Sequence, residues 1–94
     1  VSLKAGKNVR YVVPHKLDRK ALENGDVQLQ LRVARPIEED VWLEVSSESN
    51  SIVRRSERYA RPGEMVTIML KPTMAEAVRA AASLTVDVYP KAEA

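Results

Sequence analysis

The sequence contains no cysteine and only one histidine. Without cysteine, disulfide bonds, thiolate nucleophiles, iron–sulfur ligation and zinc-finger sites are all excluded. No apolar run approaches the roughly 20 residues of a membrane-spanning helix, and no charged start precedes a hydrophobic stretch. We therefore expect a soluble chain with no membrane insertion. The missing cysteines leave the compartment open, but small secreted domains more often carry a disulfide, so the cytoplasm is the expected location.

Charge of one sign is not in excess, because 15 basic residues face 13 acidic ones and the net charge is +2. Such a balance gives no support to nucleic-acid or acidic-membrane binding. The hydrophobic content of 45% and the charged content of 30% argue for a folded chain. A chain of 94 residues builds at most one core. We expect residues 1–94 to form a single domain, and the start at Val1 without methionine indicates a C-terminal fragment of a larger protein.

Few residues have the chemistry or spacing of a site. The three glycines lie far apart, so no phosphate-binding loop is present. His15 lacks carboxylates at ligand spacing, and the serines between residues 46 and 51 have no histidine base at hand. The acidic run 38–40 lacks the alternating ligands and central glycine of a calcium loop. We therefore predict no catalytic, cofactor-binding or metal-binding residue in this chain.

Apolar and polar side chains alternate along several short segments, as in half-buried strands. The strands expected on this basis cover residues 9–13, 27–33, 41–45, 66–70 and 84–89. The segment 52–60 is extended but mostly charged, which favours a sheet edge. The segment 15–25 is polar and ends in Asn-Gly, so it should be a loop.

One short helix is expected among the strands. Thr73 and Glu76 match the capping-box pattern, and the alanine-rich stretch 75–82 favours a helix of about two turns. About six or seven strands with turn signals and no βαβ alternation are typical of an all-β fold. We predict an immunoglobulin-like antiparallel β-sandwich in which the helix crosses between the sheets.

The segment 54–61 is the densest basic stretch and contains candidate docking residues. These are Arg54, Arg55, Arg58 and the interleaved Tyr59. The arginines could form edge-strand salt bridges with Glu44, Glu48 and Glu57, or they could dock a protein partner. A third reading is a nucleic-acid module, which would bind in a salt-dependent way.

Trp42 is the only tryptophan, and its place is ambiguous. The alternation that buries Val41, Leu43 and Val45 puts it on the opposite face. A β-bulge or register slip would reverse this, and tryptophan in the second or third strand of an immunoglobulin-like domain is often core. If exposed, Trp42 is the leading docking residue, because tryptophan is enriched in interface hot spots.

Three stretches carry a family resemblance. They are residues 4–14 (KAGKNVRYVVP), 26–33 (DVQLQLRV) and 61–66 (RPGEMV). Together they resemble the C-terminal domain of bacterial FAD-dependent pyridine nucleotide-disulfide oxidoreductases, relatives of the anaerobic glycerol-3-phosphate dehydrogenase large subunit. The loop 15–25 and the helix after Thr73 are local departures from that pattern.

The resemblance implies a parent that binds FAD and NAD(P) in upstream glycine-rich domains, and it carries no catalytic residue onto this chain. We expect the fragment itself to be non-catalytic and to bind no cofactor. Its implied role is interdomain or subunit docking, with the rest of the parent oxidoreductase or a partner subunit as partner. The alternative is a free-standing adhesion or ligand-binding module of the immunoglobulin or fibronectin type.

Overall fold

The computed structural model describes residues 2–17, 25–48 and 50–93. The chain is mostly β, with two sheets and one short α-helix in this part. The strands are β1 (Ser2–Ala5), β2 (Val9–Val13), β3 (Val27–Val33), β4 (Val41–Ser46), β5 (Ser51–Glu57), β6 (Val66–Leu70) and β7 (Ser83–Pro90). The helical elements are α1 (Ala75–Ala80) and two 3-10 turns, η2 (Pro72–Met74) and η3 (Lys91–Glu93).

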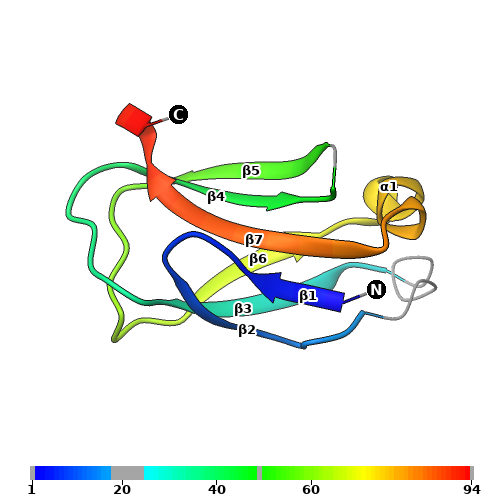
Figure 1. Ribbon diagram of the computed structural model, residues 1–94, viewed down its shortest axis with the longest axis horizontal. Helices are drawn as coiled ribbons and strands as arrows, with labels where there is room; N and C mark the ends of the chain where they lie inside the picture. Colours follow the sequence, from blue (N-terminus) through cyan, green and yellow to red (C-terminus); the bar gives the residue numbers. More distant parts are fainter. Residues whose placement is uncertain (1, 18–24, 49, 94) are drawn as a thin grey trace.

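The strands divide into a larger and a smaller sheet that lie one behind the other (Figure 1). Sheet A has four strands in the order β1-β7-β4-β5, and sheet B has three in the order β2-β3-β6. Strand β1 runs parallel to β7, whereas every other strand pair is antiparallel. Helix α1 lies in the connection from β6 in sheet B to β7 in sheet A.

The core lies between the two sheets and follows from the alternation of side chains. In sheet A, Val41, Leu43 and Val45 are at most 1% exposed, and each lies opposite an apolar residue of β7 or its terminal Pro90. Sheet B contributes the inward-facing residues of β3 and β6 to the same apolar cluster. Burying such an aliphatic side chain stabilises the fold by about 1.5–3 kcal/mol relative to leaving it in water.

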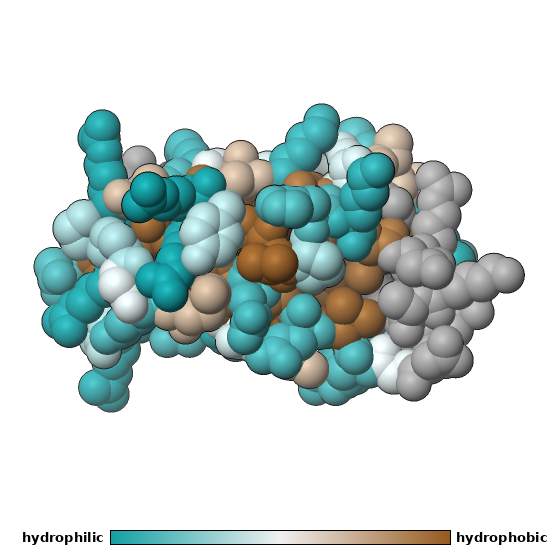
Figure 2. All heavy atoms as spheres, turned by 90° about the horizontal axis from the view of Figure 1, so that it is seen from below, coloured by the Kyte–Doolittle hydropathy of each residue, from teal (hydrophilic) through white to brown (hydrophobic). Residues whose placement is uncertain are grey.

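On one side of the molecule the edges of the two sheets are joined. The Leu3 backbone N–H donates to the His15 carbonyl at 2.8 Å, and Ser2 forms an antiparallel bridge with Lys16. These bonds link β1 of sheet A to the chain that follows β2 of sheet B. The view of this side shows apolar side chains in the middle, bordered by polar ones (Figure 2). We call it the closed side.

The turn between β1 and β2, on the closed side, is hydrogen-bonded to the β3–β4 loop and to β7. Asn8 adopts a left-handed backbone conformation (φ 53°), and its side-chain amide bonds both the N–H and the carbonyl of Arg35. The Lys7 N–H donates to the Asp87 carboxylate at 2.6 Å, and the Gly6 N–H donates to the Val86 carbonyl at 2.8 Å. The turn is therefore fixed to the β3–β4 loop and to β7.

Most sequence predictions of structure are confirmed. The mostly β class with two sheets and a short helix holds. Strands β2, β3, β4, β6 and β7 lie within about a residue of their expected bounds. Strand β5 is the expected charged edge strand, but it ends at Glu57, three residues before the expected end. Strand β1 was not predicted. The expected loop 15–25 falls mainly on residues 18–24, which lie outside the described residues. None of the helices in the described ranges is long and apolar enough to cross a membrane.

The capping box at Thr73 is wrong. No side-chain hydrogen bond caps either η2 or α1, and α1 ends at Ala80, two residues before the expected end. The reason is Pro72, which begins a 3-10 turn that contains Thr73. The N-cap position of α1 then falls on Met74, so Glu76 is only the second residue of the helix and is out of register for a reciprocal cap.

Candidate docking cleft

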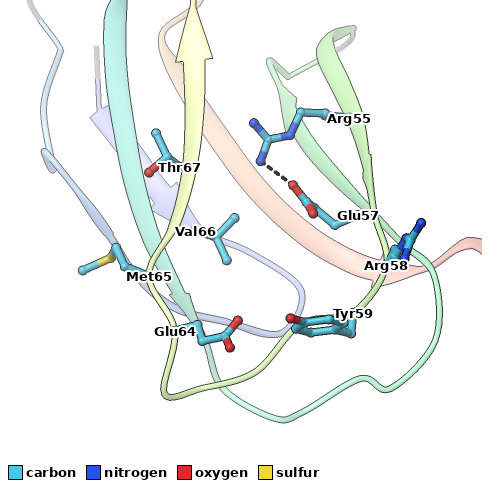
Figure 3. Close-up of a pocket in the computed structure, with 8 residues that line it drawn as sticks. All are labelled: Arg55, Glu57, Arg58, Tyr59, Glu64, Met65, Val66 and Thr67. Carbon is cyan, nitrogen blue, oxygen red and sulfur yellow. Dashed lines mark hydrogen bonds and ion pairs between the residues drawn. The ribbon is translucent and has the colours of Figure 1, made fainter.

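The side opposite the closed side is open, and a cleft of about 510 Å³ lies there between β5 and β6 (Figure 3). Both strands are edge strands, β5 of sheet A and β6 of sheet B. The lining residues from the β5 side are Arg55, Glu57, Arg58 and Tyr59, and those from the β6 side are Glu64, Met65, Val66 and Thr67. The volume falls within the range of typical ligand pockets.

The wall on the β5 side is the inner face of sheet A left uncovered. Arg55 pairs in register with Leu43, and Glu57 pairs with Val41, so both charged side chains point to the core side of the sheet. Each side chain is nevertheless 43% exposed, because the part of sheet B that the structure describes has no strand opposite β5. Their ion pair of 2.9 Å neutralises the two charges against each other on this wall (Figure 3).

On the β6 side the strand itself carries no charged side chain, and the charge on this wall is that of Glu64, just before the strand. Val66 points into the cleft, whereas Met65 and Thr67 point away from it toward the outer face of sheet B (Figure 3). The Glu64 side chain lies at the mouth of the cleft and is directed toward Tyr59 across it. Glu64 is exposed and forms no ion pair within the described part of the chain, although its charge acts on nearby Arg61 and helps to raise the pKa of that residue.

Tyr59 is held at the mouth by a stacked arginine. The Arg61 guanidinium lies 4.2 Å from the centroid of the Tyr59 ring, and Arg61 also pairs with Glu38 at 3.4 Å. The hydrogen bond and charge of Glu38 raise the pKa of Arg61 above its ordinary value. Tyr59 itself is 40% exposed and presents one edge to the cleft. An exposed, oriented aromatic ring is the kind of residue that dominates binding interfaces.

The two edge strands differ in how they are protected. Strand β5 carries Arg54, Arg55 and Glu57, and charged side chains on an edge discourage pairing with another strand. Strand β6 has the sequence VTIML and carries no charge at all. Strand β3 is its sole neighbour in the sheet, so the backbone groups along its other edge pair with no strand among the described residues.

Trp42 lies elsewhere, on the outer face of sheet A. It is half-buried and pairs in register with Tyr89 of β7, so it does not belong to the core. The guanidinium of Arg54 lies 4.2 Å from the Trp42 ring centroid, and the ammonium of Lys91 lies 4.5 Å from it. The Tyr89 hydroxyl donates to the Glu44 carboxylate at 3.1 Å. The register slip considered for β4 does not occur at Trp42.

The five predicted docking residues therefore separate into two places. Arg55 and Tyr59 line the cleft, Arg58 lies on its rim with the side chain directed away, and Trp42 and Arg54 share the opposite face of sheet A. Sequence reasoning missed Glu64 and Val66, although the Pro-Gly turn before them was recognised. Of the expected arginine–glutamate pairs, Arg55–Glu57 is present, and Glu48 instead accepts from the backbone of residues 82 and 83.

The single histidine and Ser47 of the β4–β5 loop take part in hydrogen bonds that hold the fold together. The His15 carbonyl accepts the Leu3 N–H on the closed side, and the Ser47 hydroxyl bonds Asn50 within the β4–β5 loop. Across residues 2–17, 25–48 and 50–93, no three histidine or acidic side chains group closely enough to hold a metal ion. Ser47 and Ser51 also line a smaller pocket of about 150 Å³, together with Glu48 and with Ala77 and Ala80 of α1.

Comparisons of the chain with protein-family models, curated proteins and solved structures found no match. The cleft is therefore interpreted from its own chemistry. It combines an uncharged strand edge, a neutralised ion pair, an exposed tyrosine and one carboxylate, Glu64, that forms no ion pair within the described residues. Such a surface can hold an extended polypeptide by backbone and side-chain contacts.

Proposed function

We propose that this chain is a non-catalytic docking module that binds a protein segment in the cleft between β5 and β6. The observation that carries the proposal is the uncovered inner face of β5 beside the uncharged edge of β6. A core-side wall left open to solvent costs stability, so a protein keeps one mainly where something covers it. Tyr59 and Met65, 40% exposed each, supply the aromatic and methionine side chains enriched in interfaces.

The strand order supports an immunoglobulin-like assignment. In that fold one sheet holds strands A, B, E and D, and the other holds G, F and C. Strands β2, β3 and β6 correspond to A, B and E, while β4 and β7 correspond to C and F. Strand β1 then takes the place of G beside β7, with parallel instead of antiparallel direction. The position of strand D, beside β6, is vacant among the described residues.

The parent that we propose is a FAD-dependent, NAD(P)-linked oxidoreductase, on the strength of the resemblance in residues 4–14, 26–33 and 61–66. The first stretch spans the end of β1, the following turn and β2. The second stretch forms β3, and the third leads into β6. They build the scaffold of the module and one wall of the cleft. The module would dock onto the flavin-binding body of the parent or onto a partner subunit.

The experiment compares the isolated chain with the full-length protein that contains it. We expect the isolated chain to bind neither FAD nor NAD(P)H in a titration, and we expect Tyr59→Ala to loosen its association with the rest of the protein by about tenfold or more. Val13→Ala, at an exposed valine on the far edge of sheet B, is the matched control. Saturable cofactor binding, or equal association of both variants, would overturn the proposal.

A second candidate function rests on the outer face of sheet A, where Trp42 and Tyr89 lie side by side in register. Two neighbouring aromatic rings on one sheet face favour a free-standing ligand-binding module. A signal peptide and tandem repeats in the full-length sequence would support this candidate. A glycine-rich strand–turn–helix fingerprint upstream would support the oxidoreductase instead.

A further inference from the structure

We infer that the cleft binds its partner by strand addition: an extended segment, with apolar side chains at alternate positions and a basic residue at its C-terminal end, pairs antiparallel with β6. The inference deepens the docking role proposed above and rests on it. Strand addition to an exposed sheet edge is a general mode of peptide recognition, in which main-chain hydrogen bonds give affinity and alternate side chains give specificity.

The backbone of β6 has one edge open to pairing among the described residues. All five residues of β6 pair with β3, and the alternating pattern of an antiparallel ladder leaves every second residue with its N–H and carbonyl on the other edge. That edge faces no strand among the described residues and has no charged side chain. Of the two edges at the cleft, β6 is therefore the one open to pairing, and β5 is the one protected by charge.

The inner face of β5 would form the wall that an added strand packs against. Sheet A projects beyond β6 on the open side (Figure 1). A strand added to sheet B beside β6 would therefore lie opposite β5, facing its inner side. There its inward side chains would meet half-buried Val53 and the paired side chains of Arg55 and Glu57. Apolar residues at alternate positions suit this wall, because they would cover the aliphatic part of Arg55 and the exposed side of Val53.

The same projection excludes a second copy of this chain as the occupant. Pairing two β6 strands around a two-fold axis would place both A sheets on the same side of the joined B sheets. Each β5 extends beyond its own β6, so the two β5 strands would occupy the same space. A single extended segment with no sheet attached on that side avoids this collision.

Charge selects the kind of residue at the end of the segment that lies beside the start of β6. Glu64 lies at the mouth of the cleft, next to the start of β6, and forms no ion pair in the described ranges. Arg55 is paired with Glu57 and Arg61 with Glu38, so Glu64 is the carboxylate at the mouth that lies outside an ion pair among the described residues. An antiparallel segment has its C-terminal end beside the start of β6. A lysine or arginine at that end is therefore placed to meet Glu64.

The test uses the 94-residue chain and synthetic peptides. The probe is Val-Thr-Val-Thr-Val-Thr-Lys with blocked ends, in which lysine shares a face with the valines. The control is Lys-Thr-Val-Thr-Val-Thr-Val, which has the same composition and the charge at the other end. We expect calorimetry to show tighter binding of the probe by about three- to fivefold, the effect of one exposed ion pair.

Glu64→Gln should remove this preference, and Glu76→Gln should keep it. Glu76 is an exposed carboxylate on α1, at the other end of the molecule from the cleft mouth. Equal binding of the two peptides by the unmodified chain would overturn the assigned direction, and so would a preference that survives Glu64→Gln.

N-methylation distinguishes strand addition from binding by side chains alone. One probe carries N-methyl groups on its three threonines and another carries them on its three valines. Only one of these sets of amides can face β6, so we expect one probe to lose about tenfold or more in affinity and the other to stay within about twofold. In amide hydrogen exchange, alternate residues of β6 should gain protection when the unmethylated peptide binds.

Two outcomes would overturn strand addition. The first is equal binding of both methylated probes, which would leave a docking role for the cleft intact. The second is no binding of any peptide at about 1 mM. Failure of Tyr59→Ala to affect association with the full-length protein would count against the docking role alone, because the peptide measurements do not depend on it.

Discussion

The closed and open sides of the molecule use their sheet edges in opposite ways. On the closed side, β1 and the segment after β2 join the edges through the Leu3–His15 hydrogen bond and the Ser2–Lys16 bridge. On the open side, β5 and β6 border a cleft of about 510 Å³ and share no ladder. The closed side thus pairs backbone groups of its edge strands within the chain. The open side leaves the outer backbone groups of β6 for the partner that we propose.

The comparison teaches where stability and function separate in this fold. The inward side chains of the closed side, Leu3 and Val12, are buried in the common core, so changes there should lower the free energy of unfolding. Side chains on the open side are half-exposed, so changes there should affect binding more than folding. The contrast between the two sides would be wrong if mutations on the closed side affected only binding, or if mutations on the open side affected mainly folding.

The largest effect is expected from truncating Leu3. Its side chain is 6% exposed on β1 and belongs to the common core. Leu3→Ala should lower the free energy of unfolding by about 2–3 kcal/mol, through lost burial and the cavity left behind. Val53→Ala, at a half-buried valine of β5, should cost about 1 kcal/mol or less. Urea unfolding of both variants measures the contrast, and equal losses would show that the two sides are packed alike.

The second effect concerns two glycines. A Cβ on Gly6 would collide with the Asp87 carboxylate and the Thr85 methyl group, whereas a Cβ on Gly63 would meet no atom within 4 Å. Gly6→Ala should therefore destabilise the protein by about 1–3 kcal/mol, because Asp87 must give up its bond to the Lys7 N–H. Gly63→Ala, on the loop leading to β6, should be neutral or slightly stabilising.

Thermal unfolding compares the two glycine variants directly. Adding Asp87→Ala to Gly6→Ala should recover part of the loss, since the colliding carboxylate is removed. A Gly6→Ala protein as stable as Gly63→Ala would contradict the close approach of the β1–β2 turn to β7.

Alternation explains why most strands could be predicted. The segments 27–33 and 66–70 bury one face against a single core, so their period of two is visible in the sequence. Strand β1 has one buried side chain in four residues, and its parallel pairing with β7 joins the two ends of the chain. A partner so distant leaves no local signal, so β1 was missed.

The candidate site could be predicted only in part. Arg54 and Arg55 are neighbours in sequence, but adjacent strand residues face opposite sides, so one stacks on Trp42 and the other lines the cleft. Grouping them as one basic patch ignored this alternation. The roles of Glu64 and Val66 depend on β5 and β6 being edges of different sheets, and sheet order is not a local property of the sequence.

The smallest effect is expected at Glu48, which holds the β4–β5 loop to the start of β7. The Glu48 carboxylate, in the β4–β5 loop, accepts the N–H groups of Ala82 and Ser83 at 3.0 and 2.8 Å. It thereby ties the end of the β4–β5 hairpin to the start of β7. Hydrogen bonds from its own backbone N–H and from that of Ser83 lower the pKa of Glu48 below its ordinary value of 4.5.

A carboxyl group whose pKa is lower in the folded state stabilises the fold above its unfolded pKa, and the contribution is lost as the pH falls through the folded pKa. Glu48→Gln should therefore lower the Tm slightly at pH 7, and the difference from the unmodified chain should shrink below pH 4.5, the ordinary pKa of this side chain. Glu39→Gln, at an exposed carboxylate with no hydrogen bond or ion pair in the described ranges, should leave the Tm unchanged at both pH values. If the Glu48→Gln difference instead persists in acid, Glu48 contributes through its hydrogen bonds or its shape and not through its charge.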